Sequence, residues 1–382
     1  MLINHLSELN FANFTFGMTV VSVIGSTFVG IQLYSLRDAG REPSSVDTNL
    51  NFGTRTKALM VNRFTFQFLL IATLLSVLSI FIAPYLRITP LLLAIAVMSI
   101  PVSLVTTIVD GNLYGAGRSN TVQMLSALMS ASRVTVIALG LSAGLSVPTM
   151  LALVILSALP TVALGLMLIP FKTVYMPKRL NSELILLSLH SLVIVSGFSI
   201  DIIVAPRVLG ETVASDFIPA IAIARVASLS VHLAGYFSAS TYLAKRSFLP
   251  RLRYKVAVHL VQLTVMVLII GGSQVPLAQT LYVRILGLST ESVALMLPAL
   301  AAHTIWSIVL GSLPLRARGI SPREVVGVAG IVLCAFTVAL AWVDEPNELL
   351  WVTSIAGVGL FILTSLAELR NASTRREPSF YE

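Results

Sequence analysis

The sequence predicts an all-α polytopic membrane protein with about eleven transmembrane helices, and three observations lead to this fold class. Of the 382 residues, 56% are hydrophobic and only 11% are charged, whereas soluble domains carry about 25% charged residues. The mean hydropathy of +0.91 applies to the whole chain. The apolar residues form runs of roughly 20, the length that crosses a bilayer as a helix, and the runs lack the alternation of a membrane β-barrel.

Each predicted span is an apolar run bounded by polar or basic residues. Prolines that fall within or near some spans are tolerable there, because neighbouring helices can satisfy the carbonyl groups that a proline leaves free. In chain order, the predicted spans are 11–36, 62–84, 89–109, 121–142, 147–170, 184–205, 214–239, 255–274, 291–313, 324–342 and 349–368.

The basic residues alternate between the two sides of this series of spans. Of the 25 Lys and Arg, 20 lie in the loops after the odd-numbered spans and in the C-terminal tail, and 3 lie on the opposite side. The positive-inside rule therefore predicts a protein of the cell (cytoplasmic) membrane whose N-terminus lies outside and whose C-terminus lies in the cytoplasm. Because loops of this kind account for the net charge of +8, we expect no nucleic-acid partner.

A short basic segment near the middle of the chain separates five spans from six. It predicts an N-terminal helical lobe over 1–171, a cytoplasmic linker over 172–182, a C-terminal lobe over 183–370 and a cytoplasmic tail over 371–382.

Two arginines, Arg133 and Arg225, remain inside predicted spans. Both lie about 18–21 Å from the inner surface at 1.5 Å per residue, close to the midplane of a ~30 Å hydrocarbon core. An arginine there costs about 2.5–3.5 kcal/mol on insertion scales. We therefore expect both to face a hydrated cavity, where a guanidinium can bind a phosphate or pyrophosphate through paired hydrogen bonds. The alternative is that each arginine pairs with a carboxylate and holds helices together.

The acidic candidates for such pairing are Asp201, in the outer third of its span, and Asp216, at the outer mouth of the next span. Neither position matches the predicted depth of Arg225. Asp201 can pair with Arg207, carry a proton or cation, or line the pathway, so both aspartates are candidates for ion binding or gating. His232 shares a helix face with Arg225, because seven residues make nearly two turns, and is a candidate cavity residue.

Other side chains inside spans have plainer interpretations. His190 and His303 are each interpreted as packing residues, as a lone membrane histidine commonly is. Cys334 is the one cysteine, so no disulfide or cysteine metal site is expected. No nucleotide-binding or metalloprotease motif occurs, and we expect neither a cofactor nor an enzyme.

Three stretches resemble a known family. The segment FSIDIIVAPRVLGETVASDFIPAIAIARVASL resembles the helix 7–8 hairpin of the multidrug/oligosaccharidyl-lipid/polysaccharide flippase superfamily. The segment LYGAGRSNTVQM resembles the turn before that family's helix 5. Near the N-terminus, LSELNFANFTFGMTVVSVIGSTFVGIQLYSLRDAG resembles the family's helix 2, which closes on an acidic and basic pair, here Arg37 and Asp38.

The resemblance implies two pseudo-symmetric lobes around a central cavity that opens alternately to each side, as in the multidrug-extrusion (MATE-like) branch. The implied cargo is a polyprenyl-(pyro)phosphate-linked oligosaccharide for cell-surface polysaccharide synthesis, with membrane lipids and polysaccharide polymerases or glycosyltransferases as partners. Arg225 matches the family's cavity arginine in helix 8, and Arg133 falls in helix 5. The family has twelve helices with both ends cytoplasmic, so this chain is expected to lack the first.

Two other functions are compatible with such a chain. A drug or cation antiporter of the same fold typically carries an acidic site in helix 1, the helix that this chain is expected to lack. A membrane glycosyltransferase or acyltransferase would need acidic or histidine catalytic groups, and the predicted outer loops are short with scattered acids.

Overall fold

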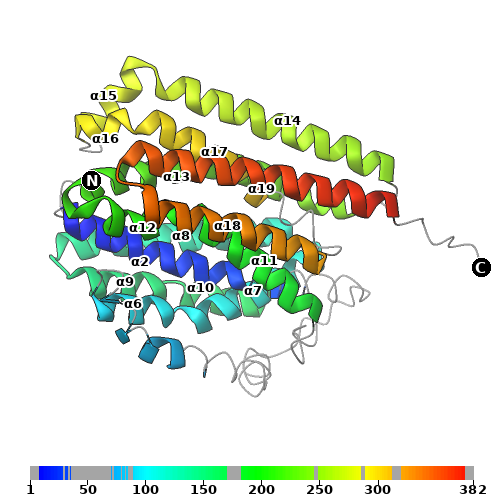
Figure 1. Cartoon of the computed structure of the whole chain (residues 1–382). Helices are drawn as coiled ribbons and strands as arrows, with labels where there is room; N and C mark the ends of the chain where they lie inside the picture. Colours follow the sequence, from blue (N-terminus) through cyan, green and yellow to red (C-terminus); the bar gives the residue numbers. More distant parts are fainter. Residues whose placement is uncertain are drawn as a thin grey trace, which may run out of the picture. The chain divides into compact units, whose positions relative to one another are not determined.

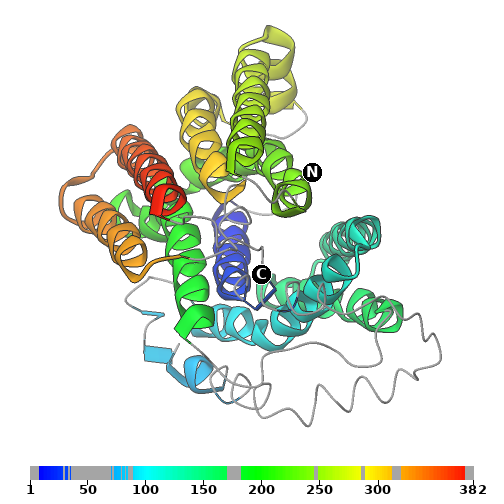
Figure 2. The same ribbon diagram turned by 90° about the vertical axis from the view of Figure 1, so that its right-hand side faces the viewer.

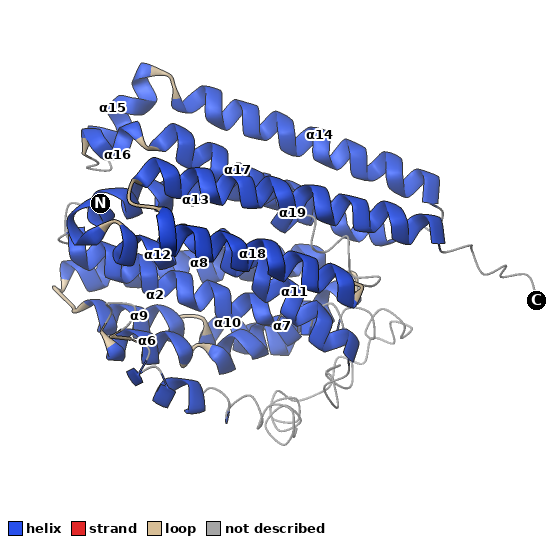
Figure 3. Ribbon diagram, viewed as in Figure 1, coloured by secondary structure: helices blue, strands red, loops and turns tan. Residues whose placement is uncertain are grey.

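The computed structural model describes residues 8–28, 89–169, 182–244, 248–284, 289–311 and 320–374, together with scattered residues between 31 and 84. Every regular element in these ranges is an α-helix (Figure 3), which confirms the predicted all-α class for this part of the chain. The predicted span 62–84, the linker and the tail fall wholly or largely outside the described residues.

Several of the described helices are long and apolar enough to cross a membrane. There are six of these, or seven if the bent pair Leu184–Phe198 and Ile200–Val208 forms one span. Asn13–Ser26 and Met296–Gly311 are apolar but shorter. The chain is therefore a multi-pass membrane protein, with fewer spans in its described part than the eleven predicted.

The chain forms two compact units, which divide between Leu192 and Val193. This division lies inside helix α11 (Ser182–Phe198). Leu184, in the first half of α11, is buried in the core of the N-terminal unit, which explains why the division comes later in the chain than a basic linker would suggest.

In the N-terminal unit, short and long helices are joined by short loops from α6 onward (Figure 1). Prolines occupy the first or second position of four of them, where the missing N–H has no intrahelical partner to lose. Predicted spans 89–109 and 147–170 are each built from two such helices. The helices are α2 (Glu8–Thr27), α6 (Pro90–Val97), α7 (Ile100–Gly115), α8 (Ser119–Ser142), α9 (Val147–Leu156) and α10 (Leu159–Leu168).

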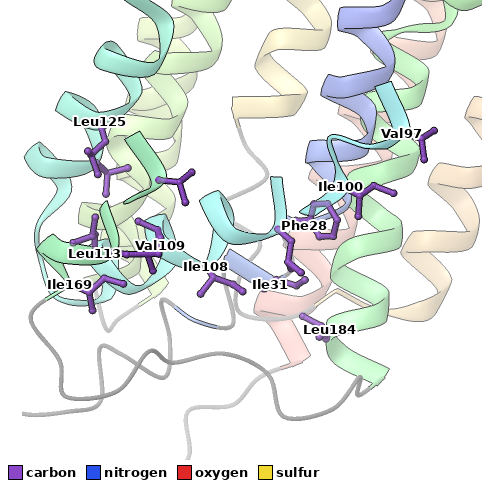
Figure 4. Packing of buried hydrophobic residues seen from close by; sticks show 14 residues of the cluster. Phe28, Ile31, Val97, Ile100, Ile108, Val109, Leu113, Leu125, Ile169 and Leu184 are labelled. Atoms are coloured by element: carbon purple, nitrogen blue, oxygen red, sulfur yellow. The ribbon is translucent and has the colours of Figure 1, made fainter. Parts of the chain in front are cut away.

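A cluster of buried hydrophobic side chains packs between the helices of this unit (Figure 4). Leu104, Ile108 and Leu113 of α7 have no solvent exposure. α10 lies so close to α7 that a Cβ on Gly165 would be 2.5 Å from Cγ1 of Val109. Glycine is therefore required where these two helices meet.

The C-terminal unit places α17 between α13, α14 and α19; Figure 2 shows α17 in yellow between α14 and the red α19. Its helices are the second half of α11, α12 (Ile200–Val208), α13 (Gly210–Ala244), α14 (Phe248–Ser273), α15 (Pro276–Arg284), α16 (Thr290–Ala294), α17 (Met296–Gly311), α18 (Pro322–Trp342) and α19 (Pro346–Thr374).

Trp306 of α17 fixes the packing at the middle of this unit. Its indole Nε1 donates a 2.7 Å hydrogen bond to the carbonyl of Thr353 in α19, and the side chain is fully buried. A Cβ on Gly197 of α11 or on Gly357 of α19 would lie 2.4 or 2.9 Å from the indole. The two glycines thus create the space into which the indole fits.

Candidate functional site

The candidate site lies where a membrane helix is broken. α11 and α12 form a pair bent by 47° around Ser199. A helix end leaves backbone carbonyls without intrahelical partners, and here Nη2 of Arg225 donates a 2.7 Å hydrogen bond to the carbonyl of Phe198. Arg225, in α13, therefore places a positive charge at the carboxyl end of α11, where the helix dipole favours it.

The same guanidinium nitrogen forms an ion pair with Asp201 in the first turn of α12. Arg225 Nη2 lies 2.6 Å from Oδ1 of Asp201, whose side chain is fully buried, while the Arg225 side chain keeps 14% of its surface exposed. The N–H of Ile202 also donates to Oδ1, at 2.8 Å. The second carboxylate oxygen, Oδ2, lies 2.7 Å from Nε2 of His303 in α17. One buried carboxylate thus serves two basic side chains.

This pair corrects the expectation that Asp201 and Arg225 lie at different depths. Leu209 and Gly210, the latter with φ +73°, reverse the chain between α12 and α13. Side chains on a helix lean toward its N-terminus, so in two helices of opposite direction Asp201 and Arg225 lean toward each other. A membrane depth estimated from the number of residues along each helix does not include this approach of the two side chains.

The ring of Phe198 forms one wall of the cluster. Cζ of Arg225 lies 4.7 Å from the ring centroid, which is cation–π geometry. The His303 ring meets the same ring edge-on at 5.1 Å, and Trp306 lies 6.5 Å away. Phe198 therefore contacts Arg225 through both its carbonyl group and its ring.

Two buried hydroxyls connect the helices that carry these groups. Ser228 Oγ donates to the carbonyl of Arg225 at 3.0 Å, and Ser307 Oγ donates to Ser228 Oγ at 3.0 Å. These bonds join α13 to α17 one turn beyond Arg225 and His303. They fix the separation between the guanidinium and the imidazole.

The other predicted site residues lie apart from this cluster. Asp216 accepts a hydrogen bond from Ser289 Oγ at 2.8 Å, and its carbonyl accepts one from Ser292 Oγ at 2.7 Å, so it anchors the start of α16. His232 belongs to α13, but its side chain is outside the described residues. Arg133 lies in α8 of the N-terminal unit, where no described residue makes an ion pair or hydrogen bond with it.

Phe198, Ser228 and His303 were not predicted as site residues. In the sequence, Phe198 is an ordinary apolar residue of a span and Ser228 an ordinary small one. His303 had a signal, since an ionisable residue inside a membrane segment indicates a functional site, but nothing in one sequence connects it to Asp201.

The charges of the cluster balance when His303 is neutral, because one guanidinium faces one carboxylate. An additional anion would therefore have to replace Asp201 on Arg225, or bind while His303 or Asp201 takes up a proton. Within the described ranges, no group of three His, Cys, Asp or Glu side chains is close enough to hold a metal ion. In comparisons with known proteins, no family model, no curated protein and no solved structure matches this chain.

Proposed function

We propose that this protein is a membrane transporter that flips a polyprenyl-(pyro)phosphate-linked oligosaccharide across the cytoplasmic membrane by alternating access. The proposal includes two lobes with about eleven spans in total and a cytoplasmic C-terminus, as the basic loops favour. The observation that carries it is the partly exposed side chain of Arg225 in a buried charged cluster at a helix break. Transporters commonly place their substrate sites at such breaks near the bilayer midplane.

The cluster suggests how the empty site avoids an unpaired charge. A lone buried arginine is costly in a membrane, and Asp201 neutralises Arg225 while no substrate is bound. A pyrophosphate presents several charged oxygens and can accept paired hydrogen bonds from a guanidinium. When a phosphate oxygen replaces Oδ1 of Asp201 on Arg225, Asp201 keeps its contact with His303. The carboxylate is thus never left without a basic partner.

Transport in proteoliposomes tests the proposal. The probe is a fluorescent polyprenyl-pyrophosphate-linked N-acetylglucosamine, and a membrane-impermeant quencher reports which leaflet holds it. We expect Arg225→Gln to lower the flipping rate at least tenfold. The matched control is Arg284→Gln, which removes an exposed arginine at the end of α15 and should leave the rate unchanged. Equal rates for wild type and Arg225→Gln, or no flipping by the wild type, would refute the proposal.

A further inference from the structure

Asp110 carries a carboxyl group inside a membrane segment of the N-terminal unit. It lies in α7, within the apolar stretch Pro90–Gly115, which is long enough to cross a bilayer. Asp110 comes five residues before the end of this stretch, or about 8 Å at 1.5 Å per residue. An ionisable side chain at such a position is costly and indicates a function.

The surroundings of Asp110 are tightly packed and largely apolar. The preceding residue, Val109, and Leu113 further on belong to the buried hydrophobic cluster of the unit. On the next residue, Gly111, a Cβ would lie 2.6 Å from the carbonyl oxygen of Gln32, so another segment of the chain runs against the helix here. Asp110 itself is half-buried, and its side chain is therefore only partly open to solvent.

The carboxyl group of Asp110 forms no ion pair and no hydrogen bond with any residue that the structure describes. The helices that pack against α7 are α2, α8 and α10, and α10 carries no charged residue. Arg118, which precedes α8, donates instead to the carbonyl of Leu168 at 3.1 Å, and Arg133 lies about 21 Å along α8 from its start. Glu8 begins α2, whose other end leads to the segment packed against α7. Within the described part of the chain, no opposite charge neutralises Asp110.

Two hydroxyls of α7 close to Asp110 are available only as hydrogen-bond acceptors. Side chains of a helix lean toward its N-terminus, so Asp110 leans over Thr106 and Thr107, one turn earlier. Their hydroxyls donate to the carbonyls of Val102 and Ser103 at 2.8 and 2.7 Å, which leaves their oxygen lone pairs for Asp110. A protonated carboxyl group can donate to these oxygens, whereas a carboxylate only accepts. These two hydroxyls therefore favour the protonated form.

We propose that Asp110 is a proton-binding site, whose carboxyl group binds a proton and releases it to water at the adjacent end of the membrane segment. A carboxylate without a partner in apolar surroundings is neutralised by a proton. The hydroxyl of Ser35 is buried without a described hydrogen-bond partner, and Cβ of Ser35 lies 2.8 Å from the position of a Cβ on Gly111. A hydroxyl can donate to a carboxylate and accept from a carboxyl group, so it suits both states of the exchange. The exchange breaks only the O–H bond of the carboxyl group, and the proposal does not depend on the transport function.

Reaction with dicyclohexylcarbodiimide tests the protonation of Asp110, because this apolar reagent adds to a protonated carboxyl group and forms a stable N-acylurea. Protein in proteoliposomes is treated between about pH 6 and pH 9, and the labelled residues are identified by peptide mass spectrometry. Near neutral pH we expect Asp110 to react at least tenfold faster than Glu291, which is exposed at the start of α16. Its rate should fall at least tenfold across this pH range. A rate no higher than that of Glu291, or one independent of pH, would overturn the proposal, and so would slower labelling in sodium chloride than in choline chloride, which would show a sodium site instead.

Infrared spectroscopy gives a second readout that does not depend on access of a reagent. Asp110→Asn keeps the shape of the side chain and removes only its titration. At about pH 6, the difference between wild type and Asp110→Asn should contain the C=O band of a protonated carboxyl group, and carboxylate bands should replace it as the pH rises. Carboxylate bands at every pH, as an ion pair with a basic side chain would give, would overturn the proposal.

Discussion

Removing either charge of the Asp201–Arg225 pair is expected to destabilise the C-terminal unit severely. Asp201 is fully buried and lies 2.6 Å from Arg225 and 2.7 Å from His303. Loss of one partner of a buried ion pair costs about 3–5 kcal/mol, because the remaining charge no longer faces an opposite charge. His303 stays beside Asp201, but it carries no charge when the cluster is balanced. For a unit of this size, at about 2–4 °C per kcal/mol, Asp201→Asn or Arg225→Gln should lower Tm by about 6–20 °C.

The double variant makes this prediction specific to the pair. Asp201→Asn combined with Arg225→Gln removes both charges and leaves two amides that can hydrogen-bond to each other. Its loss of unfolding free energy should be smaller than the sum of the single losses by about 2 kcal/mol, within the range of coupled neighbours. Thermal unfolding in detergent can be followed by tryptophan fluorescence, since Trp306 adjoins the cluster. Additive losses, or single losses below about 1 kcal/mol, would show that the pair is not the buried interaction described above.

Three further changes test the packing around the helix break. Gly197→Ala places a Cβ 2.4 Å from the Trp306 ring and should lower the free energy of unfolding by about 1–3 kcal/mol. The control Gly271→Ala, where nothing lies within 4 Å of the added Cβ, should not lower it. Equal effects of the two variants in a denaturant titration would contradict the tight contact at Gly197. Phe198→Leu removes the ring beside Arg225 and should cost about 0.5–2 kcal/mol, whereas a stability unchanged by this substitution would argue against the cation–π contact. Trp306→Phe loses the hydrogen bond to Thr353 and should cost about 1 kcal/mol, measurable as a lower Tm; a wild-type Tm would count against that bond.

The sequence was a good guide to the class of fold and to many helix positions. Apolar runs bounded by basic loops predicted helices at 121–142 and 324–342, and the structure has α8 and α18 there. Pro101 and Pro160 were expected to be tolerated within or near spans. Both lie inside the apolar stretches Pro90–Gly115 and Val147–Leu168, each at the second position of a helix, α7 or α10, which suits a proline better than a helix interior.

The candidate site was predicted less completely. The cost of a charge inside a membrane indicates Arg225 and Asp201 as candidates, but their contact depends on side-chain direction and on the reversal of the chain at Gly210. His303 comes from a helix far along the chain, and its contact with Asp201 depends on how α17 packs against α13. One sequence holds no information on such pairings, whereas hydropathy is local and can be read directly.

Binding of the anionic head group by Arg225 can be measured as the affinity of the purified protein for polyprenyl-pyrophosphate-linked N-acetylglucosamine, in wild type and in Arg225→Gln. We expect Arg225→Gln to weaken binding at least tenfold, about 1.4 kcal/mol, while the affinity for the same sugar on an uncharged polyprenol stays the same. Equal affinity of both proteins for the pyrophosphate-linked sugar would contradict the claim that Arg225 binds the anionic head group.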